Sequence, residues 1–305
     1  MDHIRAIIQH TKEHAVFPLV CADHCAWLLK KEFSEVAHDP EQLADAFEYG
    51  LNLYDSDAVM LFVDAYVEAQ AMGCPVRYAP YPQLEGPRSE KYVDRTGIII
   101  EAAVLLQQRI SVPVFVSIKG PFSLASFLSG VENFLKMILT DEEAARGLID
   151  EALGHQISYV KQLLDTGVHI FIGDPVASSS VISPDTFSDF ALEPLKTLCR
   201  QIKQGDRIAG IHICGDTEPI ITMLDDIDAD ILSIEDIIPR TRTVKMGGVS
   251  TGALIRNDSE QVRREVKAAL AMRPLILSTS CDVPVQTVPD ILKTMISAYH
   301  EYETE

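Results

Sequence analysis

Three side chains of types that bind zinc stand at the ends of apolar runs in this sequence. His212 and Cys214 lie two residues apart at the end of one run, and Cys281 follows another. Residues two apart in a strand point to the same face, so the imidazole and the thiol would lie side by side. Zinc is commonly held by His and Cys, and three protein ligands leave a fourth position open for a substrate. The spacing predicts an open zinc site of His212, Cys214 and Cys281, if the fold brings residues 212 and 281 together.

Composition and charge exclude several classes of protein. The chain has 305 residues, of which 47% are apolar and 23% charged, as in ordinary proteins with a large core. A formal net charge of −19 argues against a nucleic-acid partner, because a polyphosphate requires a basic patch. No apolar run approaches the about 18 residues of a membrane span, and the N-terminal residues lack the apolar core of a secretory signal. We therefore expect a cytoplasmic protein with no membrane partner and with reduced thiols.

In a reducing compartment, clustered cysteines are more often ligands or catalysts than disulfides. None of the six cysteines belongs to a C-x-x-C pair. Besides the two zinc candidates, the others are interpreted as structural: Cys21, Cys25, Cys74 and Cys199.

Eight short runs of apolar or β-branched residues alternate with helical patterns along the chain. The runs cover residues 17–20, 57–63, 112–117, 168–172, 208–212, 230–234, 244–249 and 274–278. This alternation implies a parallel sheet, and eight units in a chain of this length fit an α/β fold of the (β/α)8 type, a TIM barrel, as a single domain over 1–305. A doubly wound open sheet would call for a glycine-rich nucleotide motif after the first strand, and none is present.

Helical periodicity and capping residues locate several helices. We expect helices over residues 2–15, 39–54, 96–108 and 259–271. Thr140, with Glu143 three residues later, predicts a capping box, and Ser183 before Pro184 predicts another helix start. Residues 119–122 are expected to form a loop, and the Pro- and Gly-rich residues 74–95 an extended insertion or hairpin.

Polar residues follow the expected strands at the end where a barrel builds its active site. Strands five and eight are not neighbours, but the lumen is narrow enough for His212 and Cys281 to meet across it. Glu235 or Asp236 is expected to accept the proton of a substrate thiol, or to occupy the fourth zinc position without substrate. Asp64 and Asp174 are expected to orient His212 by hydrogen bonding, although such carboxylates also serve as helix caps or ion-pair partners.

Several stretches along nearly the whole chain match one known family. They are residues 63–73, 120–126, 174–178 with 182–184, 212–217, and 280–284 with Thr287. The most specific is the His-x-Cys-Gly of residues 212–215 paired with the late Ser-Cys-x-x-Pro of residues 280–284. Through these stretches the chain resembles the uroporphyrinogen decarboxylase superfamily, in particular its zinc-dependent corrinoid methyltransferase branch, typified by methylcobamide:coenzyme M methyltransferases. The resemblance implies a TIM barrel, Zn²⁺ on His212, Cys214 and Cys281, and methylcobalamin carried by a partner corrinoid-binding protein.

The sequence also departs from the family's patterns. A uroporphyrinogen decarboxylase carries an arginine-bearing motif that would fall near residues 17–25, where this chain has no arginine. A substrate with eight carboxylates would find few cations here, which disfavours porphyrinogen decarboxylation. Gly247 and Gly248 begin a Gly-Gly-Val-Ser stretch in place of the Gly-Asn-Val-Asp more usual in the methyltransferase branch, and this bears on the substrate more than on the metal.

We therefore expect an enzyme that moves a methyl group between a methyl-corrinoid protein and a zinc-activated thiol resembling coenzyme M. An alternative is transfer from a methylated small molecule, such as an aryl methyl ether or a methylamine, to a corrinoid protein. A non-catalytic zinc-binding protein, which would show a fourth protein ligand, is a further alternative. Lys119 would suit a sulfonate, and Tyr66 and Phe122 are possible wall residues of the substrate pocket.

Overall fold

Eight parallel strands form one curled sheet in the computed structural model, which describes residues 2–78, 81–89 and 93–304. The strands are β1 (His14–Val16), β2 (Val59–Leu61), β5 (Val114–Lys119), β6 (His169–Gly173), β7 (Ala209–Ile213), β8 (Ile231–Ile234), β9 (Val244–Val249) and β10 (Leu275–Thr279). Their order in the sheet is β1-β10-β9-β8-β7-β6-β5-β2. The predicted parallel barrel is confirmed.

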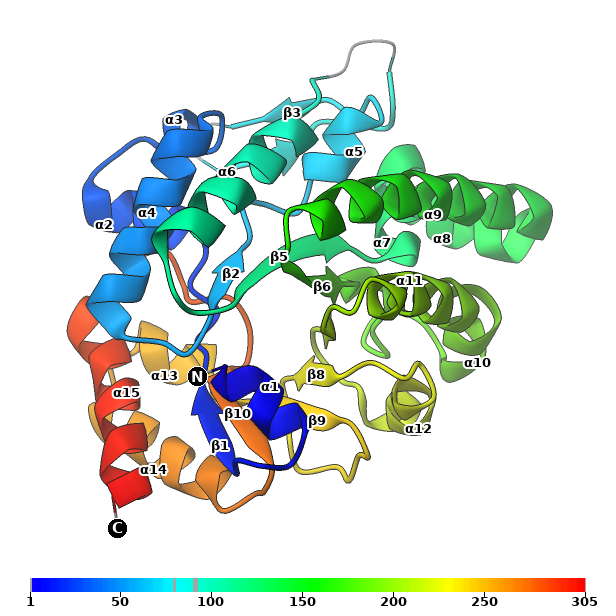
Figure 1. Cartoon of the computed structure of the whole chain (residues 1–305). Helices are drawn as coiled ribbons and strands as arrows, with labels where there is room; N and C mark the ends of the chain where they lie inside the picture. The colour runs from blue at the N-terminus through cyan, green and yellow to red at the C-terminus, as the bar shows by residue number, and fades with distance from the viewer. Residues whose placement is uncertain (1, 79–80, 90–92, 305) are drawn as a thin grey trace.

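The helices lie outside this sheet. They are α1 (His3–Ile8), α2 (Ala22–Leu29), α3 (Phe33–Val36), α4 (Pro40–Tyr54), α5 (Val67–Ala71), α6 (Thr96–Arg109), α7 (Pro121–Ser129), α8 (Val131–Thr140), α9 (Glu142–Asp165), α10 (Pro184–Thr186), α11 (Leu192–Gln204), α12 (Ile221–Asp225), α13 (Thr251–Ile255), α14 (Ser259–Leu270) and α15 (Pro289–Thr304). Helices α4, α6, α9, α11, α14 and α15 surround the strands (Figure 1). Residues 235–243 connect β8 to β9 without a helix.

The barrel closes between β1 and β2 through the backbone and side chain of Asp57 instead of a strand ladder. The backbone N–H of Asp57 donates to the carbonyl of Val16 at 2.8 Å, and the Asp57 carboxylate accepts from the N–H of Val16 at 2.8 Å. Asp57 thereby satisfies backbone groups that the two short edge strands would otherwise leave unpaired.

The first predicted elements are displaced. Helix α1 ends at Ile8, and the next strand occupies residues 14–16, so the helix predicted over 2–15 is too long and the strand predicted at 17–20 is too late. His10 adopts a φ of +54°, a left-handed conformation that stops the helix. Strand β1 then pairs with β10, and this long-range pairing is invisible to a local helical pattern.

Two further local predictions need correction. Thr140 ends α8, and Asp141 is the cap of α9, because its carboxylate accepts from the N–H of Ala144. The expected loop at residues 119–122 contains the start of α7 at Pro121. Ser183 does cap the helix that begins at Pro184. The first error arises because Thr140 and Asp141 are adjacent and have similar capping ability.

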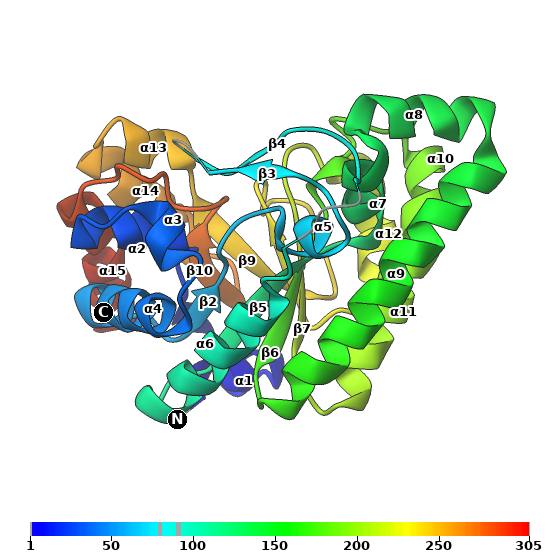
Figure 2. The same ribbon diagram turned by 90° about the horizontal axis from the view of Figure 1, so that it is seen from above.

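The segment 74–95 carries a short antiparallel pair, β3 (Val76–Arg77) with β4 (Gln83–Leu84). Residues 79–80 and 90–92 of that predicted insertion lie outside the described residues. Figure 2 shows the strands in the middle of the molecule, with β3 and β4 running across one end of the barrel.

The barrel lumen is apolar at its base. On β5, Val114, Val116 and Ile118 belong to the core under the helices, whereas Phe115 belongs to the cluster that fills the lumen with Phe171. Gly210 makes room for this filling, because a Cβ there would lie 2.3 Å from the Phe171 ring. Above Phe115, Ser117 and Lys119 face the lumen together with apolar residues such as Met60 and Phe62.

No single helix in the described part of the chain is long and apolar enough to cross a membrane, and one bent pair, α7 with α8, meets the length and composition test together.

Candidate metal centre

The three predicted zinc ligands meet at the carboxyl ends of β7 and β10. Nε2 of His212 lies 3.0 Å from Sγ of Cys214 and 3.8 Å from Sγ of Cys281, and the two sulfurs are 3.8 Å apart. Gly215 follows with a φ of +73°, and a Cβ there would lie 2.6 Å from the Ser180 hydroxyl. A glycine is therefore required for the chain to turn immediately after Cys214.

The spacing of these donors fits a zinc ion. Tetrahedral zinc, with bonds of about 2.3 Å to sulfur and about 2.0 Å to nitrogen, places two sulfurs about 3.8 Å apart and a sulfur about 3.5 Å from a nitrogen. The sulfur–sulfur distance here is 3.8 Å, and the two nitrogen–sulfur distances of 3.0 and 3.8 Å bracket the second value. Among the described residues, no fourth His, Cys, Asp or Glu joins the group. The donor set and its spacing are compatible with a zinc ion that has one position open.

The two thiols share a hydrogen bond, which shifts their pKa values in opposite directions. The hydrogen bond with Cys281 lowers the pKa of Cys214, and the same bond together with burial raises the pKa of Cys281. Zinc bound here would take both sulfurs as thiolates, so metal binding would release the protons of both thiols.

A serine holds the far side of the His212 ring. Ser233 Oγ lies 3.0 Å from His212 Nδ1, and the two residues are partners in the β7–β8 register. This contact leaves Nε2 facing the sulfurs. The expectation that Asp64 or Asp174 hydrogen-bonds to His212 is wrong, because Ser233 occupies that position. The sequence signal for this contact was Ser233 itself, a serine in an otherwise apolar strand next to the strand of His212.

Asp64 belongs to a buried ion pair. Its carboxylate lies 2.9 Å from the Arg95 guanidinium, and it accepts the N–H of Tyr66 at 2.8 Å. Arg95 is fully buried and also donates to Gln70 at 2.7 Å. The geometry joins the end of β2 to the start of α6.

Asp174 is buried behind the start of α7. Oδ1 accepts the N–H of Ser123 at 2.7 Å, and Oδ2 has no hydrogen-bond partner in the described structure. A Cβ at Gly120 would lie 2.2 Å from this carboxyl group, so Gly120 leaves the space that Asp174 fills. Burial raises the pKa of Asp174 to about 6.

The structure brings only one of the two acidic residues after β8 to the metal group. Glu235 is exposed and accepts the N–H of Gly215 at 2.6 Å, one residue from Cys214. Asp236 is exposed and accepts the N–H of Ile238 at 2.9 Å within its own turn. A role in accepting a thiol proton therefore stays a prediction for Glu235.

A cavity of about 180 Å³ adjoins the three ligands. Its lining includes Leu19, Met60, Phe62, Ala65, Ser117, Lys119, Phe171, Gly173, Pro175, His212, Cys214, Cys281 and Asp282. A second cavity of about 330 Å³ shares Phe62, Ala65 and Asp282 with it and is also lined by Tyr66. Phe122, by contrast, is fully buried against Phe134 and lines neither cavity, so the expectation that it walls the pocket is wrong.

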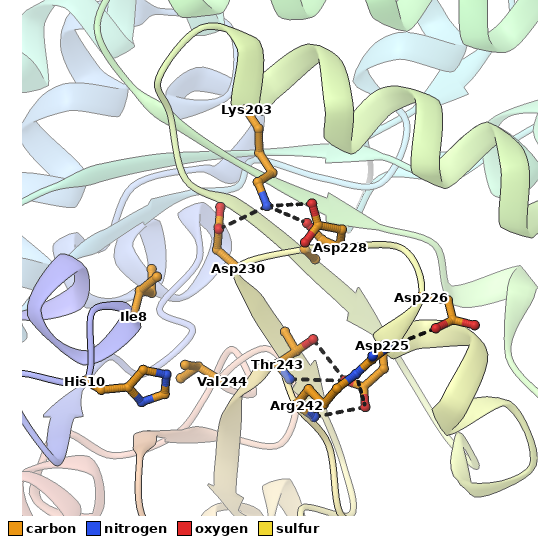
Figure 3. A pocket seen from close by; sticks show the side chains of 11 residues that line it. Ile8, His10, Lys203, Asp225, Asp226, Asp228, Asp230, Arg242, Thr243 and Val244 are labelled. Carbon is orange, nitrogen blue, oxygen red and sulfur yellow. Dashed lines mark hydrogen bonds and ion pairs between the residues drawn. The ribbon is translucent and has the colours of Figure 1, made fainter.

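A larger cavity, of about 460 Å³, lies at the opposite end of the barrel, where the strands begin. Figure 3 shows that its two cations, Lys203 and Arg242, are both paired with aspartates. Lys203 reaches Asp228 at 2.9 Å and Asp230 at 3.6 Å, and Arg242 reaches Asp226 at 2.9 Å. These acidic residues form no group of metal donors in the described chain.

Comparison with known proteins places this site in a family. The model of the uroporphyrinogen decarboxylase (URO-D) family matches residues 18–302. The chain belongs to the URO-D family. The match includes all three metal-site residues and every strand of the barrel from β2 to β10.

Relatives in the URO-D family include methyltransferases and decarboxylases. The chain is 26% identical over 298 residues to the methylcobamide:CoM methyltransferase MtaA of Methanosarcina barkeri, covering 88% of this chain and 86% of that protein. It is 26% identical over 319 residues to MtbA of Methanosarcina acetivorans, another methylcobamide:CoM methyltransferase, covering 94% and 93%. It is 23% identical over 305 residues to the uroporphyrinogen decarboxylase of Thermodesulfovibrio yellowstonii, covering 90% and 88%.

A solved methyltransferase from Methanosarcina mazei has the same fold. It superposes with a TM-score of 0.88 at 23% identity, over 98% of this chain and 97% of that one. Two activities therefore occur among URO-D relatives, and the choice between them depends on the site.

Proposed function

We propose that this URO-D family protein is an enzyme that transfers a methyl group from a methyl-corrinoid protein to a small thiol, with zinc held by His212, Cys214 and Cys281. The observation that carries the proposal is this group of one nitrogen and two sulfur donors, open on one side to a cavity. Zinc bound there would stabilise the acceptor sulfur as its thiolate, the nucleophilic form of a thiol. The methylcobamide:CoM methyltransferase activity of the relatives named above supports the same class of reaction.

The residues around the donors orient the reaction and exclude water. Ser233 fixes the ring of His212. Met60, Phe62 and Phe171 supply the apolar part of the cavity lining. In the transfer, a sulfur–carbon bond forms and the cobalt–carbon bond breaks, and the electron pair of that bond stays on cobalt. The thiol proton leaves before attack, and the exposed carboxylate of Glu235 beside Gly215 offers it a path to solvent.

The size of the cavity supports a small acceptor. At about 180 Å³ it is below the roughly 300 Å³ at which ordinary ligand pockets begin. A corrinoid would therefore approach from outside, on its own carrier protein. The same limit disfavours a tetrapyrrole substrate.

The direct test is demethylation of methylcobalamin under anoxic conditions, followed by absorbance. Protein loaded with one equivalent of zinc should demethylate it in the presence of a thiol, and metal-free protein should not. Cys281→Ala should be inactive, whereas Cys199→Ala, which alters a buried thiol on α11, should retain activity. Absence of thiol-dependent demethylation by zinc-loaded protein, with free methylcobalamin and with methylated corrinoid proteins, would overturn the proposal.

A further inference from the structure

The two sulfurs of the metal centre are close enough to bond with each other. Sγ of Cys214 and Sγ of Cys281 lie 3.8 Å apart, so an approach of about 1.8 Å brings them to the length of a disulfide bond, about 2.05 Å. Neither residue belongs to a strand, because Cys214 directly follows β7 and Cys281 lies two residues beyond β10. Rotation of the side chains and adjustment of the loops therefore suffice for this approach, and the strand ladder stays intact.

Access separates these two cysteines from the other four. Cys214 and Cys281 are half-buried and line the cavity of about 180 Å³. The remaining four are at most 2% exposed: Cys21, Cys25, Cys74 and Cys199. Thiol–disulfide exchange requires that a sulfur of the incoming molecule reach the protein sulfur. A small disulfide that enters the cavity therefore meets the two cysteines of the metal centre.

A thiol substrate implies such a disulfide. Any small thiol that fits the cavity has a symmetrical disulfide, which forms when the pool of that thiol is oxidised. Its two halves carry the same end group as the thiol, so one half fits where the thiol fits. The neighbouring cavity of about 330 Å³, which shares Phe62, Ala65 and Asp282 with the first, gives room for the other half.

We propose that Cys214 and Cys281 form a reversible redox switch, in which a small disulfide converts them to an intramolecular disulfide and the oxidised chain does not bind zinc. This inference rests on the proposed function for the metal and for the class of thiol, whereas the disulfide itself requires no methyl transfer. Zinc takes cysteine sulfur as thiolate, so zinc binding and oxidation of the pair exclude each other. The site would thereby be open to metal only while the thiol pool is reduced.

The exchange has two balanced steps. The thiolate of one site cysteine attacks a sulfur of the small disulfide, the S–S bond of that molecule breaks, and one small thiol leaves. The other cysteine then attacks the first cysteine's sulfur, the protein disulfide forms, and the second small thiol leaves. The two protein thiols lose two electrons and two protons, and the small disulfide gains both. With the protein sulfurs 3.8 Å apart the second step is intramolecular, so the mixed disulfide does not accumulate.

The test exposes the protein to the disulfide of 2-mercaptoethanol under anoxic conditions. Metal-free protein should lose two of its six thiols, counted with a chromogenic reagent after unfolding. Mass spectrometry of a non-reduced digest should show the peptides of Cys214 and Cys281 joined. The oxidised protein should no longer compete with a chelator for zinc, and dithiothreitol should restore both the thiols and zinc binding. Protein loaded with zinc beforehand should keep all six thiols.

Variants locate the bond. Cys281→Ser removes the thiol that completes the exchange, so Cys214 should stop at the mixed disulfide, seen as the added mass of one 2-mercaptoethanol unit. Cys214→Ser should stop in the same way at Cys281. Cys199→Ala, which removes a buried thiol on α11, should form the same disulfide as the unmodified protein. Circular dichroism establishes that each variant is folded.

The outcomes separate the two proposals. Retention of all six thiols by the metal-free protein would overturn the inference, and so would a disulfide between another pair or an oxidised chain that still binds zinc. A reversible Cys214–Cys281 disulfide in a protein that transfers no methyl group when reduced and loaded with zinc would support the switch and count against the proposed function. Methyl transfer by a chain that forms no such disulfide would leave the proposed function standing alone.

Discussion

Ser233 Oγ lies 3.0 Å from His212 Nδ1, on the adjacent strand and level with it in the sheet. The contact holds the imidazole plane so that Nε2 faces Cys214 and Cys281. Metal-binding histidines generally depend on such a partner at the second ring nitrogen, which fixes both the tautomer and the orientation. Here the partner is a neutral hydroxyl group, so the ring gains orientation without the added basicity that a carboxylate would supply.

Ser233→Ala should therefore weaken zinc binding without disturbing the fold. Loss of such a partner typically costs roughly 10- to 100-fold in metal affinity. Competition with a chromogenic chelator measures this. Ser278→Ala is the matched control, since Ser278 is a buried serine on β10 whose hydroxyl has no hydrogen-bond partner among the described residues. Equal zinc affinity in the two variants would show that Ser233 does not position His212.

Cys214→Ala and Cys281→Ala should each lose stoichiometric zinc, because two remaining donors make a weak site. Metal analysis after gel filtration should find about one zinc per chain in the unmodified protein and in Cys199→Ala. Circular dichroism should be unchanged in all variants, since both site cysteines follow strands and lie outside the main core. A double variant that still retains one tightly bound zinc would place the metal elsewhere.

Gly120→Ala should destabilise the protein strongly. The new methyl group would lie 2.2 Å from the Asp174 carboxyl, which is itself held by the start of α7. Overpacking of this kind costs about 1–3 kcal/mol or more in the free energy of unfolding. Gly147→Ala is the control, because a Cβ at that position of α9 meets nothing within 4 Å. An alanine in a helix is favoured there by about 0.5–1 kcal/mol. Urea unfolding should move the two midpoints in opposite directions.

The raised pKa of Asp174 predicts a pH-dependent contribution to stability. Its pKa is about 6 in the fold against 3.8 without it, so the fold favours the protonated form. The associated stability is fully present below about pH 4 and is lost as the pH rises through about 6. The shift corresponds to a loss of about 3 kcal/mol.

Asp174→Asn removes this titration and keeps an oxygen to accept from Ser123. The free energy of unfolding of the variant, minus that of the unmodified protein, should therefore rise by about 3 kcal/mol between about pH 4 and about pH 7.5. Urea titrations of both proteins across this range measure the difference. A difference that stays constant would contradict the protonation of buried Asp174.

The barrel and the grouping of His212, Cys214 and Cys281 could be predicted from local pattern. Alternation of short apolar runs with helical periodicity depends only on residues close together in the sequence. For this reason seven of the eight barrel strands overlap the runs predicted for them. His212 and Cys214 share a strand end, and the topology of a barrel then requires that Cys281 faces the same opening. The resemblance to the URO-D family rested on the same stretches.

The partners of the charged and polar groups depended on tertiary structure. Asp64 and Arg95 form one ion pair although 30 residues separate them along the chain, and His212 meets Ser233 only through the register of two strands. Burial also differs among the charged groups: Asp174 is enclosed beside α7, Glu235 is exposed, and Lys119 is enclosed with no counterion among the described residues. Which residues occur at strand ends is a property of the chain itself. Which atoms they contact, and whether water reaches them, follows from packing between distant segments, because hydrogen bonds and desolvation act over a few ångströms of space.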